Sequence, residues 1–316
     1  MALAQALINL ESEAGRFFKI PSLDDDVVKG LLESVEASGG LPVTIDYREK
    51  ILAVSRTDLT EVILPLCSWL EGLVKIHAEK EGGECHGRLL IGIVGPAGAG
   101  KSTLSQILCA TCTILSGGAP WVQCVSMDGY SFPNSRLVAE QAVDNLGRIC
   151  TLKDIKGLPS TLDVNVLLQD LLRLRTAGND PILLPAYDRG LHEPVPNSVA
   201  IATDCKMVIF EGLHLLHTNG LWKDVSQVFY RTVFLDIERS CCFERVVGRK
   251  VANGRSRESS EAHFDRVDGP TFEQLQHERA RANLTLVVRP TPECPLHVVN
   301  VEVRSSNETQ HVGLMK

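Results

Sequence analysis

The stretch that decides the fold reads Gly95-Pro96-Ala97-Gly98-Ala99-Gly100-Lys101-Ser102 and continues with Thr103. It matches the pattern G-x-x-x-x-G-K-[ST] at every fixed position. A continuous apolar run, 89–94, leads into it, and a segment with helical periodicity, 104–115, follows it. The motif needs a strand, a glycine-rich loop and a helix in this order, so the stretch predicts a phosphate-binding loop rather than a chance glycine-rich turn.

Each part of this loop has a physical role in binding a nucleoside triphosphate. Small residues let successive backbone N–H groups curl around a phosphate, and the N-terminus of the next helix adds partial positive charge. Lys101 is expected to reach the β- and γ-phosphate oxygens, and the Ser102 hydroxyl to bind Mg²⁺. Guanine-specific P-loop proteins carry an Asn-Lys-x-Asp stretch, and the dipeptide Asn-Lys does not occur here, so ATP is favoured.

Apolar runs with the character of strands recur downstream of the loop. They lie at 122–127, 182–185, 207–210, 232–235, 284–288 and 296–303. Helical periodicity fills gaps between them at 104–115, 164–175 and 239–251. Strands that alternate with helices predict an α/β fold, here a three-layer P-loop NTPase sandwich around a mostly parallel sheet.

The N-terminal residues follow a mainly helical pattern. Leucines at helical spacing begin the chain, a second helix is expected to end at Gly39-Gly40, and Asp58 is the expected N-cap of a third. The polar, glycine-rich stretch 79–87 is the expected linker. These observations divide the chain into a mainly helical N-terminal extension (1–85), a P-loop domain (86–305) and a C-terminal tail (306–316).

Composition excludes several classes of protein. The 316 residues are 44% hydrophobic and 22% charged, which suffices for a core and excludes a mainly disordered chain. A net charge of −7 argues against nucleic acid as a partner. No apolar run approaches the ~20 residues of a membrane helix, and the first ten residues lack the basic residues of a targeting segment. Ten dispersed cysteines indicate free thiols in a reducing compartment, so we expect a cytoplasmic protein.

A carboxylate follows the second predicted strand of the P-loop domain. Asp128 stands in VSMDGY (125–130), at the expected carboxyl end of that strand, where ligands bind in open α/β sheets. A carboxylate beside a γ-phosphate can accept a proton from an incoming hydroxyl or hold Mg²⁺. Considered alone, Asp128 also fits a solvated turn residue before glycine.

Five motifs downstream of the loop resemble those of the phosphoribulokinase/uridine kinase family, which includes the bacterial-type pantothenate kinases. They are SMDGYSFPN (126–134), GLPSTLD (157–163), LPAYDR (184–189), VIFEG (208–212) and an arginine-rich stretch from Arg245 to Ser256. The resemblance covers about residues 88–303, and Leu162 stands where the family usually has an aromatic residue. The spacing is most similar to that of the sugar- or nucleoside-kinase-like members.

The resemblance implies an ATP-dependent kinase that transfers the γ-phosphoryl group of ATP·Mg²⁺ to a hydroxyl of a sugar, nucleoside or pantothenate-like acceptor. The implied roles are catalysis for Asp128 (general base), Lys101 and Arg249; nucleotide binding for 95–103 and Arg255; acceptor binding for Tyr130, Tyr187 and Arg189; and Mg²⁺ binding for Ser102 and Glu211. A homodimer is a family-level expectation, and neither a membrane nor nucleic acid is an expected partner.

Structural roles are the alternatives for several of these residues. Glu211 also fits a polar residue at a strand end, and Arg189 also fits an ion pair with Asp188 or Glu193. Arg249 lies four residues after Arg245, as on a solvated basic helix face.

Two other functions are compatible with the motifs. One is an ATPase with water as the acceptor, which drives or times an assembly through residues 1–85. The other is a nucleotide-binding scaffold without turnover, against which the intact Lys101, Ser102 and Asp128 argue.

Overall fold

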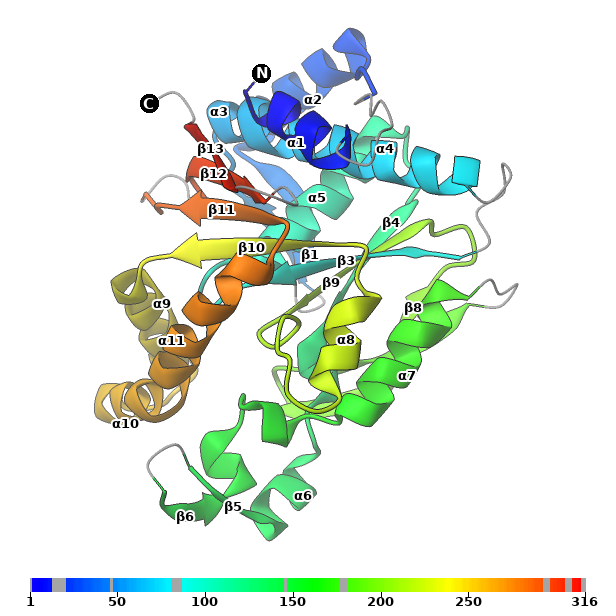
Figure 1. The fold of residues 1–316 in the computed structure, drawn as a ribbon. Helices are drawn as coiled ribbons and strands as arrows, with labels where there is room; N and C mark the ends of the chain where they lie inside the picture. The colour runs from blue at the N-terminus through cyan, green and yellow to red at the C-terminus, as the bar shows by residue number, and fades with distance from the viewer. Residues whose placement is uncertain are drawn as a thin grey trace.

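The computed structural model describes residues 2–12, 21–45, 48–80, 87–144, 147–176, 181–291, 296–304 and 309–313 (Figure 1). Their centre is a seven-stranded sheet in the order β13-β12-β11-β10-β3-β9-β4. Its parallel strands are β4 (Val122–Ser126), β9 (Met207–Gly212), β3 (Leu89–Val94), β10 (Arg231–Ile237) and β11 (Leu284–Val288). At one edge, β12 (Val298–Arg304) and β13 (Thr309–Gly313) continue the sheet in antiparallel pairing. The prediction of a mostly parallel α/β sheet is confirmed.

Helices cover both faces of this sheet and give the expected three layers (Figure 1). The alternation of side chains along β3 separates the two cores, since Leu89, Ile91 and Ile93 join one core and Leu90 and Val94 join the other. The first core includes α5 (Lys101–Leu115), and the second includes α7 (Val164–Arg175) and α8 (Trp222–Val228). Burial on both faces explains why the sequence of β3 is a continuous apolar run.

The N-terminal residues pack on the α5 side of the sheet. They form α1 (Ala2–Ser12), α2 (Asp25–Ser38), the hairpin of β1 (Leu41–Ile45) with β2 (Arg48–Leu52), and α4 (Leu64–Lys80). Their buried side chains belong to the same core as those of α5. Glu11 of α1 accepts two hydrogen bonds from the Arg231 guanidinium of β10, at 2.7 and 2.8 Å, and this ion pair ties the N-terminal helices to the sheet.

The expectation that Asp58 caps a helix is wrong. Ser55 is the cap, because its hydroxyl accepts the backbone N–H of Asp58 at 2.9 Å, and the helix begins there as α3 (Arg56–Asp58). Asp58 is buried and accepts the N–H of Val298 at 3.1 Å instead. Of the expected linker at 79–87, residues 81–86 lie outside the described residues.

The apolar run at 182–185 forms a strand outside the central sheet. β7 (Ile182–Asp188) pairs antiparallel with β8 (Glu193–Ile201) as a separate ribbon. The ribbon packs beside the 3₁₀ turn Met127–Tyr130 that follows β4. It therefore carries its end, with Tyr187 and Arg189, to the carboxyl edge of the parallel sheet.

Smaller elements complete the fold at this edge. They are α6 (Asn134–Ala139), β5 (Gln141–Val143) paired with β6 (Ile149–Thr151), the 3₁₀ turns Leu152–Ile155 and Pro159–Thr161, and the helices α9 (Arg239–Ala252), α10 (Arg257–His263) and α11 (Gly269–Glu278). Among the described residues, no helix is both long and apolar enough to cross a membrane.

Candidate active site

The glycine-rich loop joins β3 to α5 in a shape that side chains would disturb. Gly98 and Gly100 have φ angles of 84° and 96°, in the left-handed region that favours glycine. A Cβ on Gly98 would lie 3.2 Å from the carbonyl oxygen of Cys242 in α9. Arg245 of the same helix donates to the Gly98 carbonyl at 3.0 Å. The loop is thus held against α9, and the backbone N–H groups that begin α5 are left for a phosphate.

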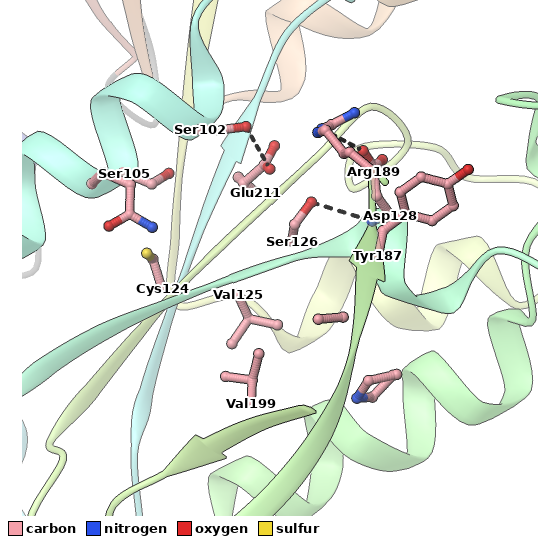
Figure 2. Close-up of a pocket in the computed structure, with 13 residues that line it drawn as sticks. Ser102, Ser105, Cys124, Val125, Ser126, Asp128, Tyr187, Arg189, Val199 and Glu211 are labelled. Atoms are coloured by element: carbon pink, nitrogen blue, oxygen red, sulfur yellow. Dashed lines mark hydrogen bonds and ion pairs between the residues drawn. The ribbon is translucent and has the colours of Figure 1, made fainter. Parts of the chain in front are cut away.

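Lys101, Ser102 and Glu211 form a polar group beside the loop. The Ser102 hydroxyl donates to Glu211 Oε1 at 2.8 Å (Figure 2), and Lys101 Nζ donates to the Pro96 carbonyl at 3.1 Å. Burial raises the pKa of Glu211, and the Lys101 ammonium opposes this rise. Burial likewise lowers the pKa of Lys101, and the Glu211 and Asp128 carboxylates oppose this lowering. Each charge makes the burial of the other less costly.

Asp128 lies in the turn after β4, beneath the end of the β7–β8 ribbon. The ribbon can approach because the next residue is Gly129, where a Cβ would lie 2.5 Å from the Pro185 carbonyl oxygen. Arg189, at the end of the ribbon, donates from Nη2 to Asp128 Oδ2 at 3.2 Å (Figure 2). The Asp128 side chain remains 43% exposed, so it is accessible to a ligand.

Two cavities meet at Asp128. The first, of about 430 Å³, is the P-loop cavity, lined by Ala97, Gly98, Gly100, Lys101, Ser102, Thr103, Asp128, Arg189, Glu211, Leu213, Arg245, Arg249, Asp268 and Leu296. The second, of about 230 Å³, is lined by Ser102, Ser105, Gln106, Cys124, Val125, Ser126, Asp128, Pro185, Ala186, Tyr187, Arg189, Val199 and Glu211 (Figure 2). Ser102, Asp128, Arg189 and Glu211 line both cavities, so a ligand in one lies next to a ligand in the other.

Two of the residues predicted from the sequence lie elsewhere. Tyr130 does not reach the second cavity, because its side chain is buried in the core and its hydroxyl donates to Asp170 Oδ2 at 3.1 Å. Burial and the Asp170 carboxylate raise the pKa of Tyr130, which keeps the hydroxyl neutral. Arg255, between α9 and α10, lines a third cavity and not the P-loop cavity.

Lys156 was not found by sequence reasoning. Its ammonium donates to the Tyr187 hydroxyl at 2.9 Å, at the rim of the second cavity. The signal that could have pointed to it is its position directly before the GLPSTLD motif, whose Gly157 carbonyl lies 2.8 Å from the ring nitrogen Nε2 of buried His214.

The chain is similar to known proteins over most of its P-loop domain. The family model described as "Phosphoribulokinase / Uridine kinase family" matches residues 90–289. The chain is 28% identical over 258 residues to the uncharacterized protein YggC of Escherichia coli (strain K12), which covers 82% of this chain and 95% of YggC. It is 28% identical over 166 residues to a pantothenate kinase of Rhizobium meliloti, covering 51% of this chain and 46% of that enzyme.

Solved structures share the fold. A candidate fructose transport system kinase from Silicibacter sp. TM1040 matches with a TM-score of 0.53 and 24% identity, over 66% of this chain and 94% of that one. YFH7 from Saccharomyces cerevisiae, described as a candidate P-loop kinase, matches with a TM-score of 0.50 and 16% identity, over 65% and 94%. Since the family model spans more than half of the sequence, the chain belongs to the phosphoribulokinase/uridine kinase family of ATP-binding P-loop kinases.

Proposed function

We propose that this family member is a small-molecule kinase, which transfers the γ-phosphoryl group of ATP·Mg²⁺ to a hydroxyl group. The observation that carries the proposal is the position of Asp128, which lines both the P-loop cavity and the second cavity. A γ-phosphate over the loop and a hydroxyl in the second cavity would meet beside this carboxylate. We therefore call the second cavity the acceptor cavity.

The chemistry assigned to these residues is a direct in-line transfer. Asp128 accepts the proton of the acceptor hydroxyl while the hydroxyl oxygen forms a bond to the γ-phosphorus. The bond between this phosphorus and the β,γ-bridging oxygen breaks, and ADP leaves. Lys101 and Arg249, which line the P-loop cavity, balance the charge of the transferring group. Arg189 orients the Asp128 carboxylate.

The residues present fit a magnesium ion. Mg²⁺ prefers oxygen ligands and is usually held by one or two carboxylates together with the phosphates of the substrate. Ser102 Oγ and the buried Glu211 carboxylate, 2.8 Å apart beside the loop, form such a donor set. Once bound there, Mg²⁺ would neutralise charge on the β- and γ-phosphates.

The proposed acceptor is a sugar, a nucleoside or a pantothenate-like alcohol. Relatives named as pantothenate kinases, and a Schizosaccharomyces pombe protein named as a candidate uridine kinase, support this range. The chain covers less than half of the pantothenate kinase from Rhizobium meliloti, and 74% of the S. pombe protein. A cavity of about 230 Å³ with Tyr187 and Arg189 in its wall suits a small polar molecule.

The test is ADP release by the purified protein with ATP·Mg²⁺, alone and with a panel of hydroxyl-bearing metabolites. We expect one acceptor class to raise the rate strongly. Lys101→Ala and Asp128→Asn should each abolish this increase, since a positioned general base contributes about 10²–10⁴-fold. Steady ADP release that no acceptor changes, lost in Lys101→Ala but kept in Asp128→Asn, would leave an ATPase and overturn the proposal.

A further inference from the structure

A third cavity, of about 740 Å³, lies between the turn that follows β6 and the α9–α10 pair. Its wall is made of Arg148, Lys153, Asp154, Lys156, Lys250, Arg255, Ser259, Ala262, His263, Asp265 and Arg266. Six of these residues are lysine or arginine and two are aspartate. Burial lowers the pKa of His263 to about 4, so this histidine adds no charge at neutral pH. The wall of the cavity thus carries more positive than negative side chains, although the chain as a whole is acidic.

Half of these cations are balanced by carboxylates. The ion pairs are Arg148–Asp144 at 2.7 Å, Lys250–Asp268 at 2.7 Å and Arg266–Asp154 at 3.5 Å. A paired guanidinium or ammonium has little attraction left for a ligand. These three pairs therefore hold the wall together rather than provide a binding site.

The other three cations lack a carboxylate partner among the residues that the structure describes. Lys153 Nζ donates to the neutral side-chain oxygen of Asn134 at 3.1 Å, and Lys156 Nζ to the neutral Tyr187 hydroxyl at 2.9 Å. Arg255 makes no hydrogen bond or ion pair with any described side chain. Among the described residues, no carboxylate forms an ion pair with these three cations. The nearest negative charges are Asp265, which lines the same cavity, and Glu193 and Asp128, which partly offset the lowering of the Lys156 pKa by burial. The cations therefore outnumber the carboxylates at this open cavity.

Tyr187 connects this cavity to the acceptor cavity. Its side chain lines the acceptor cavity together with Asp128, and its hydroxyl accepts from Lys156 of the third cavity. Burial and Asp128 raise the pKa of Tyr187 to about 12, while Arg255 acts in the opposite direction, so the charges of both cavities reach this phenol. The Tyr187 side chain therefore lies between the two cavities, with Asp128 on one side and Lys156 on the other.

We propose that the acceptor carries an anionic group, a phosphate or a carboxylate, which binds Lys153, Lys156 and Arg255 while its reacting hydroxyl lies at Asp128. The inference rests on the proposed function and narrows its acceptor to charged molecules. Charge-assisted hydrogen bonds to an anion are about twice as strong as neutral ones, and this is what unbalanced ammonium and guanidinium groups favour. A neutral sugar or nucleoside leaves the three charges unused.

A binding experiment tests the cation site without any turnover. Inorganic phosphate is titrated by calorimetry into the full chain whose P-loop is already filled with a non-hydrolysable ATP analogue and Mg²⁺. We expect one phosphate site, weakened about tenfold or more by Lys156→Gln and by Arg255→Gln. Lys223→Gln, at an exposed lysine of α8, is the matched control and should bind phosphate like the wild type. Equal phosphate affinity in Lys156→Gln and the wild type would overturn the inference.

A kinetic experiment asks whether the anion belongs to the acceptor. Charged and uncharged members of matched pairs are compared: a hexose with its monophosphate, a nucleoside with its monophosphate, and pantothenate with its uncharged alcohol analogue. We expect kcat/KM about tenfold or more higher for the charged member of the active pair, and Lys156→Gln should remove this preference through KM. Phosphate should compete with that acceptor.

The outcomes separate the two proposals. Preference for the uncharged member, or phosphate binding that does not compete with the acceptor, overturns the anionic acceptor and leaves the kinase in place. The absence of any Asp128-dependent transfer overturns the proposed function itself.

Discussion

Asp128 Oδ2 and Arg189 Nη2 lie 3.2 Å apart at the place where the P-loop cavity and the acceptor cavity meet. One residue follows a strand of the parallel sheet, and the other ends the β7–β8 ribbon. Their side chains are 43% and 36% exposed, so the ion pair is open to ligands. In the proposed reaction, the acceptor hydroxyl would meet a carboxylate that the Arg189 guanidinium already orients.

Replacement of Arg189 by glutamine should impair turnover more than it impairs folding. We expect kcat/KM for the acceptor to fall about 10- to 100-fold, because the carboxylate loses a charge-assisted hydrogen bond. Arg136→Gln is the control, since Arg136 forms an exposed ion pair with Glu140 on α6. Steady-state kinetics should show less than about a twofold change for this control. Equal losses in both variants would contradict the orienting role of Arg189.

Replacement of Gly98 by alanine should weaken nucleotide binding. The new Cβ would meet the Cys242 carbonyl oxygen at 3.2 Å, in a backbone conformation with a φ of 84°. We expect affinity for an ATP analogue to fall about tenfold or more, measured by calorimetry. Gly118→Ala is the control for backbone strain outside the P-loop. Gly118 has a φ of 100°, and nothing lies within 4 Å of the new Cβ. It should lose about 1 kcal/mol of stability and keep its nucleotide affinity.

Replacement of Glu211 by glutamine should change the response to Mg²⁺. The amide keeps the size of the side chain and an oxygen to accept from Ser102, but it removes the charge. We expect kcat to fall about 100-fold and half-saturation to require more Mg²⁺. A Mg²⁺ titration of ADP release checks both effects. An unchanged Mg²⁺ requirement with normal ATP affinity would argue that Glu211 is only a polar residue at a strand end.

The free energy of unfolding should decrease as the pH falls from 6.5 to 4, because the buried His214 resists protonation in the folded protein. Burial lowers the pKa of this histidine to about 4, below its ordinary value of 6.5. The unfolded chain therefore binds a proton between pH 6.5 and 4 that the folded chain does not. The stabilisation is complete above pH 6.5 and is lost as the pH falls toward 4. For His214 alone it amounts to about 3 kcal/mol, and His263 adds a second contribution in the same window.

The measurement is the free energy of unfolding in urea at several pH values. His214→Gln keeps an N–H donor for the Gly157 carbonyl but cannot bind the proton. Its pH dependence should be shallower by about 1.4 kcal/mol per pH unit within this window. A slope equal to that of the wild type would show that another group is responsible.

The ion pair between Glu11 and Arg231 should stabilise the whole fold. The Glu11 side chain is only 4% exposed and also accepts from the Trp69 indole at 3.3 Å. Glu11→Gln should lower the free energy of unfolding by about 3 kcal/mol, because it leaves a largely buried guanidinium without its counter-charge. Glu33→Gln, which breaks an exposed pair with Lys29, should cost less than about 1 kcal/mol. Equal costs in the two variants would contradict this prediction.

The loop and its carboxylate could be predicted because local sequence encodes both. Glycines at fixed spacing produce the loop, and a polar residue directly after an apolar strand run lies at the carboxyl edge of the sheet. Side-chain direction is different, because it depends on what packs nearby. Tyr130 is two residues from Asp128, yet one side of the 3₁₀ turn faces the core and the other a cavity.

The pairing of segments that are distant in the sequence could not be predicted either. The run at 182–185 is as apolar as a sheet strand, and only its partner β8 shows that it forms a ribbon. Lys156 reaches Tyr187 through turns that carry no periodic signal. Ser55 and Asp58 are equally good capping residues on chemical grounds, and they take different partners: Ser55 accepts the Asp58 N–H, while Asp58 accepts the Val298 N–H.

The helix that begins at Lys101 is enclosed on both sides. Its inner side chains share a core with the sheet, and its outer side meets the N-terminal helices, where the Cys67 thiol donates to the Leu108 carbonyl at 4.0 Å and lies next to the Cys112 thiol. In evolution, a change of side-chain volume on the outer side of α5 has to be matched by a change in the N-terminal helices that pack against it. Related sequences should therefore show paired substitutions at Cys67 and Cys112. Such pairs would indicate that the N-terminal helices and the ATP-binding loop evolved together.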